Sequence, residues 1–177
     1  MTITNTSQLK RLTHGSILRC LLPIKNGSKN LLFFPGGPGI ESDYLSDLTI
    51  KLQDYNCWLF DYPRNSFESE NFIKWTADAR EAIKFLRNVI PLGHSFGGFL
   101  LMMIDDLNKY CSGCILLSSS PSYESFIAAR VGLKNIQAPR TKECLKNYKE
   151  NKGDNSFREL VNSWTPYYFT EKTQKMG

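Results

Sequence analysis

The chain has 177 residues, of which 41% are hydrophobic and 22% are charged, and its formal net charge is +5. This length can bury one sizeable core, and the composition is that of a globular protein rather than of a disordered or fibrous one. The modest basic excess is dispersed and is not gathered into a stripe with interleaved aromatic residues, so we expect no nucleic-acid partner.

The sequence shows no signal for export or for membrane insertion. Residues 1–8 are polar and lack the basic flank and apolar region of a secretory signal. The longest strongly apolar run, residues 99–104, is too short to span a bilayer. We therefore expect a cytoplasmic protein with no membrane partner.

Five cysteines are scattered along the chain, an odd number that does not suggest a disulfide framework. Cys111 and Cys114 have the spacing of a redox pair, but Cys114 opens a strand-like run rather than a helix. We interpret both as structural thiols, with a redox pair as the alternative. Because no histidine accompanies them at zinc-site spacing, we expect no metal site, and we expect no cofactor.

Short apolar runs alternate with helical periodicity through the first 120 residues. Strands are expected at residues 9–12, 16–22, 31–34, 57–60, 89–90 and 114–117. Helices are expected at residues 43–55 with Ser42 as N-cap, at 72–88, and from the glycine-rich turn at 93–98 to about residue 110. This rhythm predicts an α/β fold with a mostly parallel, doubly wound sheet behind a leading hairpin.

From residue 123 onward only helices are expected, at 124–133, 141–151 and 156–164. In a parallel sheet, ligands bind beyond the carboxyl ends of the strands. We therefore expect four loops that follow strands to meet at one edge, namely residues 35–39, 61–66, the turn at 95, and 118–121.

The stretch Gly93-His94-Ser95-Phe96-Gly97 is a G-x-S-x-G motif between a predicted strand and a predicted helix. Ser95 at the apex of such a turn would hold its hydroxyl clear of the sheet, as a nucleophile must. A Cβ at Gly93 or Gly97 would meet the neighbouring strand and helix, which explains the glycines. The alternative is an ordinary glycine-rich turn, but Gly98 and the flanking elements favour the nucleophile.

The loop Pro35-Gly36-Gly37-Pro38-Gly39 follows the buried strand expected at 31–34. Acyl transfer needs an oxyanion hole, and backbone N–H groups fixed in a turn supply one at little reorganisation cost. We expect Gly37 and Phe96 to donate these N–H groups, while Gly36 lets the loop backbone approach closely. The alternative is a plain Pro-Gly loop.

Together these features resemble the α/β-hydrolase superfamily, and within it the proline iminopeptidase-like branch. The turn at residues 36–39 is similar to the H-G-G-P-G oxyanion loop, with Pro35 where histidine usually stands. Further similarities are Asp43-Tyr44-Leu45 at the usual distance, and Trp75, Asp78 and Leu86 on the helix before the turn. The resemblance covers residues 10–123.

The resemblance implies an α/β-hydrolase core over residues 1–121 and a partial helical cap over residues 122–177. It implies that the chain is an N-terminal portion that ends inside the cap and lacks the last strands. The branch often carries a glycine-containing loop after the strand at 57–60, and these glycines are absent here. We therefore interpret Asp61 as a structural residue rather than a catalytic acid.

The triad of this superfamily runs in the order Ser, acid, His, but both histidines of this chain precede Ser95. His94 cannot reach the Ser95 proton from its place in the turn and is interpreted as a packing or supporting residue; His14 is interpreted as a surface residue. The expectation is a serine hydrolase that cleaves an ester or a peptide bond through an acyl-enzyme on Ser95. Its partner is then a small-molecule or peptide substrate. The alternative is an inactive binding module that lacks the general base.

Overall fold

The computed structural model describes residues 8–37, 40–63, 69–119 and 139–168, together with isolated positions between 122 and 131. The chain divides into two compact units, Met1–Pro121 and Ser122–Gly177. The two units are described separately below.

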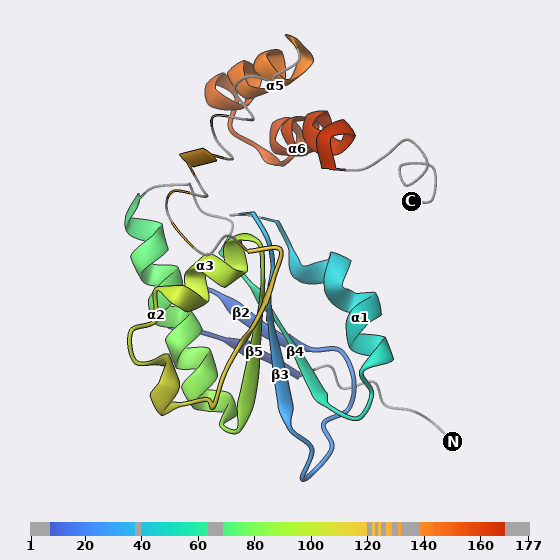
Figure 1. Cartoon of the computed structure of the whole chain (residues 1–177). Helices are drawn as coiled ribbons and strands as arrows, with labels where there is room; N and C mark the ends of the chain where they lie inside the picture. Colours follow the sequence, from blue (N-terminus) through green and yellow to red (C-terminus); the bar gives the residue numbers. More distant parts are fainter. Residues whose placement is uncertain are drawn as a thin grey trace, which may run out of the picture. The chain divides into compact units, whose positions relative to one another are not determined.

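The first unit is built on a six-stranded sheet in the order β1-β2-β4-β3-β5-β6 (Figure 1). The strands are β1 (Gln8–Arg11), β2 (Ile17–Cys20), β3 (Asn30–Phe34), β4 (Asn56–Asp61), β5 (Val89–His94) and β6 (Ile115–Leu117). β3 pairs in parallel with β4 and β5, and β5 with β6, whereas β2 is antiparallel to both β1 and β4. The predicted α/β sheet with a leading hairpin is confirmed.

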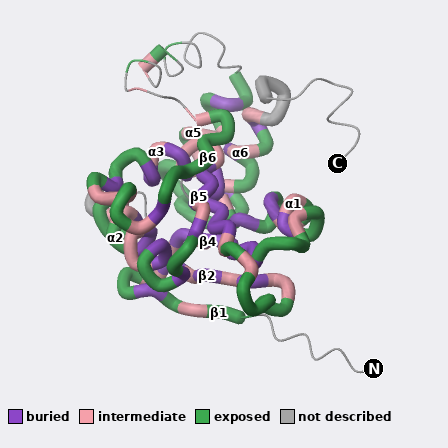
Figure 2. The backbone as a smooth tube through the Cα atoms, turned by 60° about the horizontal axis from the view of Figure 1, so that its bottom comes forward, coloured by how far each residue is buried: buried purple, intermediate pink, exposed green. Residues whose placement is uncertain are grey.

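Helices cover both faces of this sheet, with α1 on one face and α2 and α3 on the other (Figure 1). They are η1 (Ser42–Leu45), α1 (Ser46–Lys51), α2 (Ser69–Leu86), α3 (Phe96–Met102) and η2 (Leu107–Lys109). The central strand β3 is therefore buried on both faces of the sheet. Successive side chains of a strand point to opposite faces. Leu32 and Phe34 pack in one core cluster, and Leu31 and Phe33 in the other. Figure 2 shows buried positions along β4 and β5, while β1 is mostly exposed.

Helix α2 is amphipathic as predicted, and it also holds the leading hairpin. Trp75, Ala79, Ile83 and Leu86 are buried in the core cluster on its face of the sheet. The fully buried carboxylate of Asp78 accepts hydrogen bonds from the backbone N–H groups of His14 (2.8 Å) and Ser16 (3.0 Å). A buried carboxylate is tolerated when its oxygens are satisfied in this way, so Asp78 ties α2 to the turn between β1 and β2.

Two predicted helices are shorter than expected. The segment predicted at 43–55 is a 3-10 turn, η1, followed by α1, which ends at Lys51. Ser42 is not an N-cap, because its hydroxyl donates to Asp61. The helix predicted to reach residue 110 ends at Met102. Asp105 and Asp106 follow this end, and carboxylates are unfavourable at the negative end of a helix dipole.

The second unit contains α5 (Pro139–Glu150) and α6 (Asp154–Tyr168), so the helices predicted at 141–151 and 156–164 are confirmed; both begin earlier than predicted, and α6 also ends later. The two helices pack together: the Thr141 hydroxyl donates to the Ser163 carbonyl (3.3 Å), and the rings of Tyr148 and Phe157 lie 5.6 Å apart. Most of the helix predicted at 124–133 lies outside the described residues. None of the helices in the described ranges is long and apolar enough to cross a membrane.

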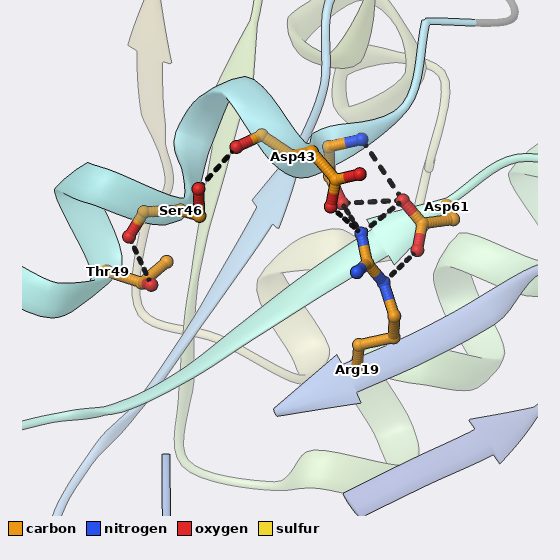
Figure 3. A network of polar contacts seen from close by, with 6 residues as sticks. Arg19, Asp43, Ser46, Thr49 and Asp61 are labelled. Carbon is orange, nitrogen blue, oxygen red and sulfur yellow. Dashed lines mark hydrogen bonds and ion pairs between the residues drawn. The ribbon is translucent and has the colours of Figure 1, made fainter. Parts of the chain in front are cut away.

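A polar network at the end of β4 fixes the approach to η1 (Figure 3). The Asp61 carboxylate accepts from Arg19 of β2 and from both the backbone N–H (3.1 Å) and the hydroxyl (2.5 Å) of Ser42. Arg19 also donates to Asp43 at 2.7 Å. Asp61 therefore joins β2, β4 and η1, in agreement with its interpretation as a structural residue rather than a catalytic acid.

Asp61→Ala should destabilise the fold more than Asp43→Ala. The Asp61 side chain is 15% exposed and the Asp43 side chain 63% exposed, so only the first substitution leaves partly buried donors without an acceptor. We expect a loss of about 1–3 kcal/mol for Asp61→Ala and less than about 1 kcal/mol for Asp43→Ala. Denaturant titrations of the two variants measure this, and equal losses would contradict the ranking.

Strand β6 is an edge strand whose three side chains are exposed: Ile115 (42%), Leu116 (42%) and Leu117 (38%). An apolar edge strand favours pairing with another chain. We expect the isolated 177-residue chain to self-associate, and Ile115→Lys to reduce that association by placing a charge at the edge. Ile73→Lys, on an exposed position of α2, is the matched control and should not. Sedimentation velocity tests this, and a monomeric wild-type chain would refute it.

Candidate functional site

Ser95 lies in the turn between β5 and α3, beyond the carboxyl end of β5 (Figure 1). Its backbone has φ 50° and ψ −113°, a conformation that a residue with a Cβ rarely adopts. The Ser95 N–H donates to the carbonyl of Leu117 in β6 at 2.8 Å. The predicted sharp turn at Ser95 is therefore present, with its strain at the candidate nucleophile itself.

Three glycines allow this turn to form, because each lies where a side chain would collide with backbone or with a neighbouring serine. A Cβ on Gly93 would lie 2.5 Å from the backbone nitrogen of Gly98, and a Cβ on Gly97 would lie 2.3 Å from the carbonyl oxygen of Phe34. A Cβ on Gly98 would lie 1.9 Å from the hydroxyl of Ser119. α3 thus starts in direct contact with the end of β3.

Ser119 is a residue of the site that the sequence analysis did not single out, although it expected the loop at 118–121 to lie there. Its hydroxyl lies 3.0 Å from the carbonyl oxygen of Ser95 and 3.3 Å from that of Gly93. Ser119 therefore fastens the loop after β6 to the turn after β5. The signal available in the sequence was its place in the loop directly after the strand predicted at 114–117.

Phe96, the first residue of α3, is anchored by aromatic side chains beneath the turn. Its ring centroid lies 5.7 Å from that of Tyr62, 5.8 Å from that of Phe72 and 6.0 Å from that of Trp75, each in an edge-to-face arrangement. The backbone N–H of a first helical residue has no acceptor within its own helix. The cluster therefore fixes the direction of an N–H group next to Ser95.

The Gly36–Gly37 loop lies against the same turn. A Cβ on Gly36 would lie 2.8 Å from Nδ1 of His94 and 3.3 Å from Cβ of Ser95. Gly37 has φ +48°, which favours glycine. Upstream, the carbonyl of Pro35 accepts a hydrogen bond from the Tyr62 hydroxyl at 3.3 Å. The structure thus brings Gly36 beside Ser95, while Pro38 and Gly39 lie outside the described residues.

Tyr44 of η1 is the second residue that sequence reasoning did not place in the site. Its hydroxyl accepts a hydrogen bond from the Gly36 N–H (2.6 Å) and lies 2.7 Å from Nδ1 of His94. Burial lowers the pKa of His94, so the neutral imidazole predominates at neutral pH. His94 therefore supports the loop, in agreement with its interpretation as a supporting residue.

Within the described residues, neither histidine forms a hydrogen bond with the Ser95 hydroxyl. His14 is exposed in the turn between β1 and β2. His94 directs Nδ1 at Tyr44, and the Asp61 carboxylate is bound to Arg19. Within the described ranges there is also no group of three or more His, Cys, Asp and Glu side chains that could hold a metal ion.

Gly97→Val should unfold the site, because the new side chain would overlap the Phe34 carbonyl and force the end of β3 away. We expect a loss of about 1–3 kcal/mol or more in unfolding free energy. Gly113→Val is the matched control, since a Cβ at Gly113 meets nothing within 4 Å. Denaturant melts of both variants measure the difference, and equal stabilities would show that the turn is not crowded.

Comparison with known proteins agrees with this architecture. No curated protein sequence matches the chain. Among solved structures, proline iminopeptidase from Mycobacterium smegmatis matches with a TM-score of 0.56 and 15% identity, over 92% of this chain and 60% of that chain. VinJ matches with a TM-score of 0.63 and 14% identity, over 90% and 60%. Epoxide hydrolase A from Mycobacterium thermoresistibile matches with a TM-score of 0.56 and 14% identity, over 80% and 49%.

The chain therefore spans 49–60% of the length of these three structures. At identities this low, the matches show that the fold is shared and nothing more. The sequence profile of one family matches residues 31–168, from β3 to the end of α6. This match covers most of the chain, including the strained serine and the glycine loop. The chain belongs to the alpha/beta hydrolase family.

Proposed function

We propose that this chain carries the nucleophile and the oxyanion hole of a serine hydrolase. The observation that supports the proposal is the strained backbone of Ser95 with the Gly36 loop packed against it. In this reaction the Ser95 oxygen bonds to the carbonyl carbon of an ester or amide, and the alcohol or amine leaves with a proton. Water then hydrolyses the acyl-enzyme and regenerates Ser95.

The oxyanion of each tetrahedral intermediate would be held by two backbone N–H groups. Gly37 follows Gly36, where an added Cβ would meet His94 and Ser95, and Phe96 begins α3. Donors fixed in this way stabilise the developing charge without reorganisation during the reaction, which is the source of their effect on rate. The glycines and the aromatic cluster around Phe96 thus serve to preorganise the site.

Attack by Ser95 needs a base that accepts its proton, and neither histidine of this chain is suitably placed. The proposal therefore includes a histidine and a carboxylate from a part of the protein beyond these 177 residues. We propose further that α5 and α6 belong to a partial helical cap formed by residues 122–177.

For the substrate, we propose a small ester or peptide, as in a proline iminopeptidase-like aminopeptidase or an esterase. This rests on the Gly36–Gly39 and Asp43-Tyr44-Leu45 motifs and on the similarity to the M. smegmatis proline iminopeptidase structure. A cytoplasmic location stays a prediction.

A second candidate function is a binding module that keeps the fold without catalysis. The observation that favours it is the unsuitable placement of both histidines. The two candidates differ in one property, the reactivity of the Ser95 hydroxyl.

A fluorophosphonate probe should label Ser95 in the full-length protein, because only an activated serine beside an oxyanion hole reacts readily with it. Ser95→Ala should abolish both labelling and ester turnover while its denaturant melt stays within about 1 kcal/mol of wild type, since it removes only a hydroxyl. Ser112→Ala, at an exposed serine before β6, is the control and should label normally. Lack of labelling where a known serine hydrolase reacts would support the binding module instead.

A further inference from the structure

We propose that Tyr44 and His94 form a positioning pair that holds the oxyanion loop in its working geometry. This inference rests on the proposed function, and it assigns a role to two side chains that do not touch the reacting atoms. The pair joins three separate segments, because Tyr44 comes from η1, His94 from the end of β5, and Gly36 from the loop after β3.

Two hydrogen bonds meet at the Tyr44 oxygen. It accepts from the Gly36 N–H (2.6 Å) and lies 2.7 Å from Nδ1 of His94, to which it donates when the neutral imidazole carries its proton on Nε2. The two rings also meet edge to face, with centroids 5.6 Å apart. One peptide group of the loop is thereby fixed to the residue that precedes Ser95.

The charge states of the two side chains suit this arrangement. Burial raises the pKa of the Tyr44 hydroxyl and lowers the pKa of the His94 imidazole. Both groups are therefore neutral at neutral pH, so that the hydroxyl can donate and Nδ1 can accept. A neutral chain of this kind holds the loop without placing a fixed charge beside Ser95.

The loop needs support of this kind because its own residues provide little. Pro35 has no backbone N–H, and Gly36 and Gly37 have no side chains. The loop is held from outside, by the Tyr62 hydroxyl on the Pro35 carbonyl and by the Tyr44 hydroxyl on the Gly36 N–H. Without Tyr44, the Pro35–Gly36 peptide group would keep the hydrogen bond from the Tyr62 hydroxyl to its carbonyl, but its N–H would lose the side-chain acceptor that it has within the described residues.

Tyr44 is itself held by the network at the end of β4. Its neighbours Ser42 and Asp43 bind Asp61 at the end of β4 and Arg19 of β2, which fixes η1 to these two strands (Figure 3). The Tyr44 hydroxyl is thus carried on a segment anchored on the sheet. This explains why a short 3-10 turn, with few hydrogen bonds of its own, can support the site.

The test compares Tyr44→Phe with wild type in the full-length protein. The substitution removes one hydroxyl and keeps the ring. We expect the rate of fluorophosphonate labelling at Ser95 and kcat for a small ester to fall about 10-fold to 100-fold, less than the loss of a whole oxyanion donor. KM should change less than about twofold, because the loop acts on the transition state.

His94 variants separate positioning from packing. His94→Asn can place an amide oxygen near the position of Nδ1 and accept the Tyr44 proton, so it should retain most of the activity. His94→Leu should lose as much as Tyr44→Phe, and the double variant should be no worse than either, as expected for residues that act as one unit. Tyr110→Phe is the matched control, since it removes a hydroxyl that binds Asp106 instead.

Amide hydrogen exchange tests the positioning without catalysis. Exchange at Gly36 should be at least about tenfold faster in Tyr44→Phe than in wild type or Tyr110→Phe. Unchanged exchange at Gly36, or unchanged labelling of Ser95 in Tyr44→Phe, overturns the positioning pair. If wild-type Ser95 is not labelled at all while Gly36 exchange responds as expected, the proposed hydrolase function fails, and the pair remains as a support of the loop.

Discussion

The site depends on the close approach of the start of α3 to the end of β3. The backbone at Gly97 lies so near the Phe34 carbonyl that any side chain would overlap it. This contact forces the chain through a sharp turn, and the turn places Ser95 in a conformation that costs free energy. The surrounding packing must therefore offset that strain.

Two kinds of interaction provide this compensation, aromatic packing and hydrogen bonds. Beneath the turn, Phe96 is enclosed by the aromatic cluster of Tyr62, Phe72 and Trp75, whose rings meet it edge to face. Beside it, hydrogen bonds fix particular atoms, with Ser119 on the Ser95 carbonyl and Tyr44 on the Gly36 N–H. The aromatic packing holds the start of α3, and the hydrogen bonds hold the loops after β6 and β3.

The sheet and the turn could be predicted because their signals are local. An unbroken apolar run such as Leu31–Phe34 is typical of a strand covered on both faces, and the spacing of Trp75, Ala79 and Ile83 is typical of an amphipathic helix. The helix ends were predicted less well. Ser42 looked like an N-cap, but its hydroxyl binds a carboxylate nineteen positions away in the sequence.

By itself, the sequence determined the order of the elements, the glycine-dependent turn at Ser95 and the glycine loop after β3. These follow from side-chain size, backbone freedom and periodicity, which act over a few residues. Only the tertiary structure decided which side chains hold the site together. Tyr44 and His94 are 50 residues apart, and Ser119 and Ser95 are 24 apart. Their pairing depends on the order in which the strands assemble, which no short stretch of sequence specifies.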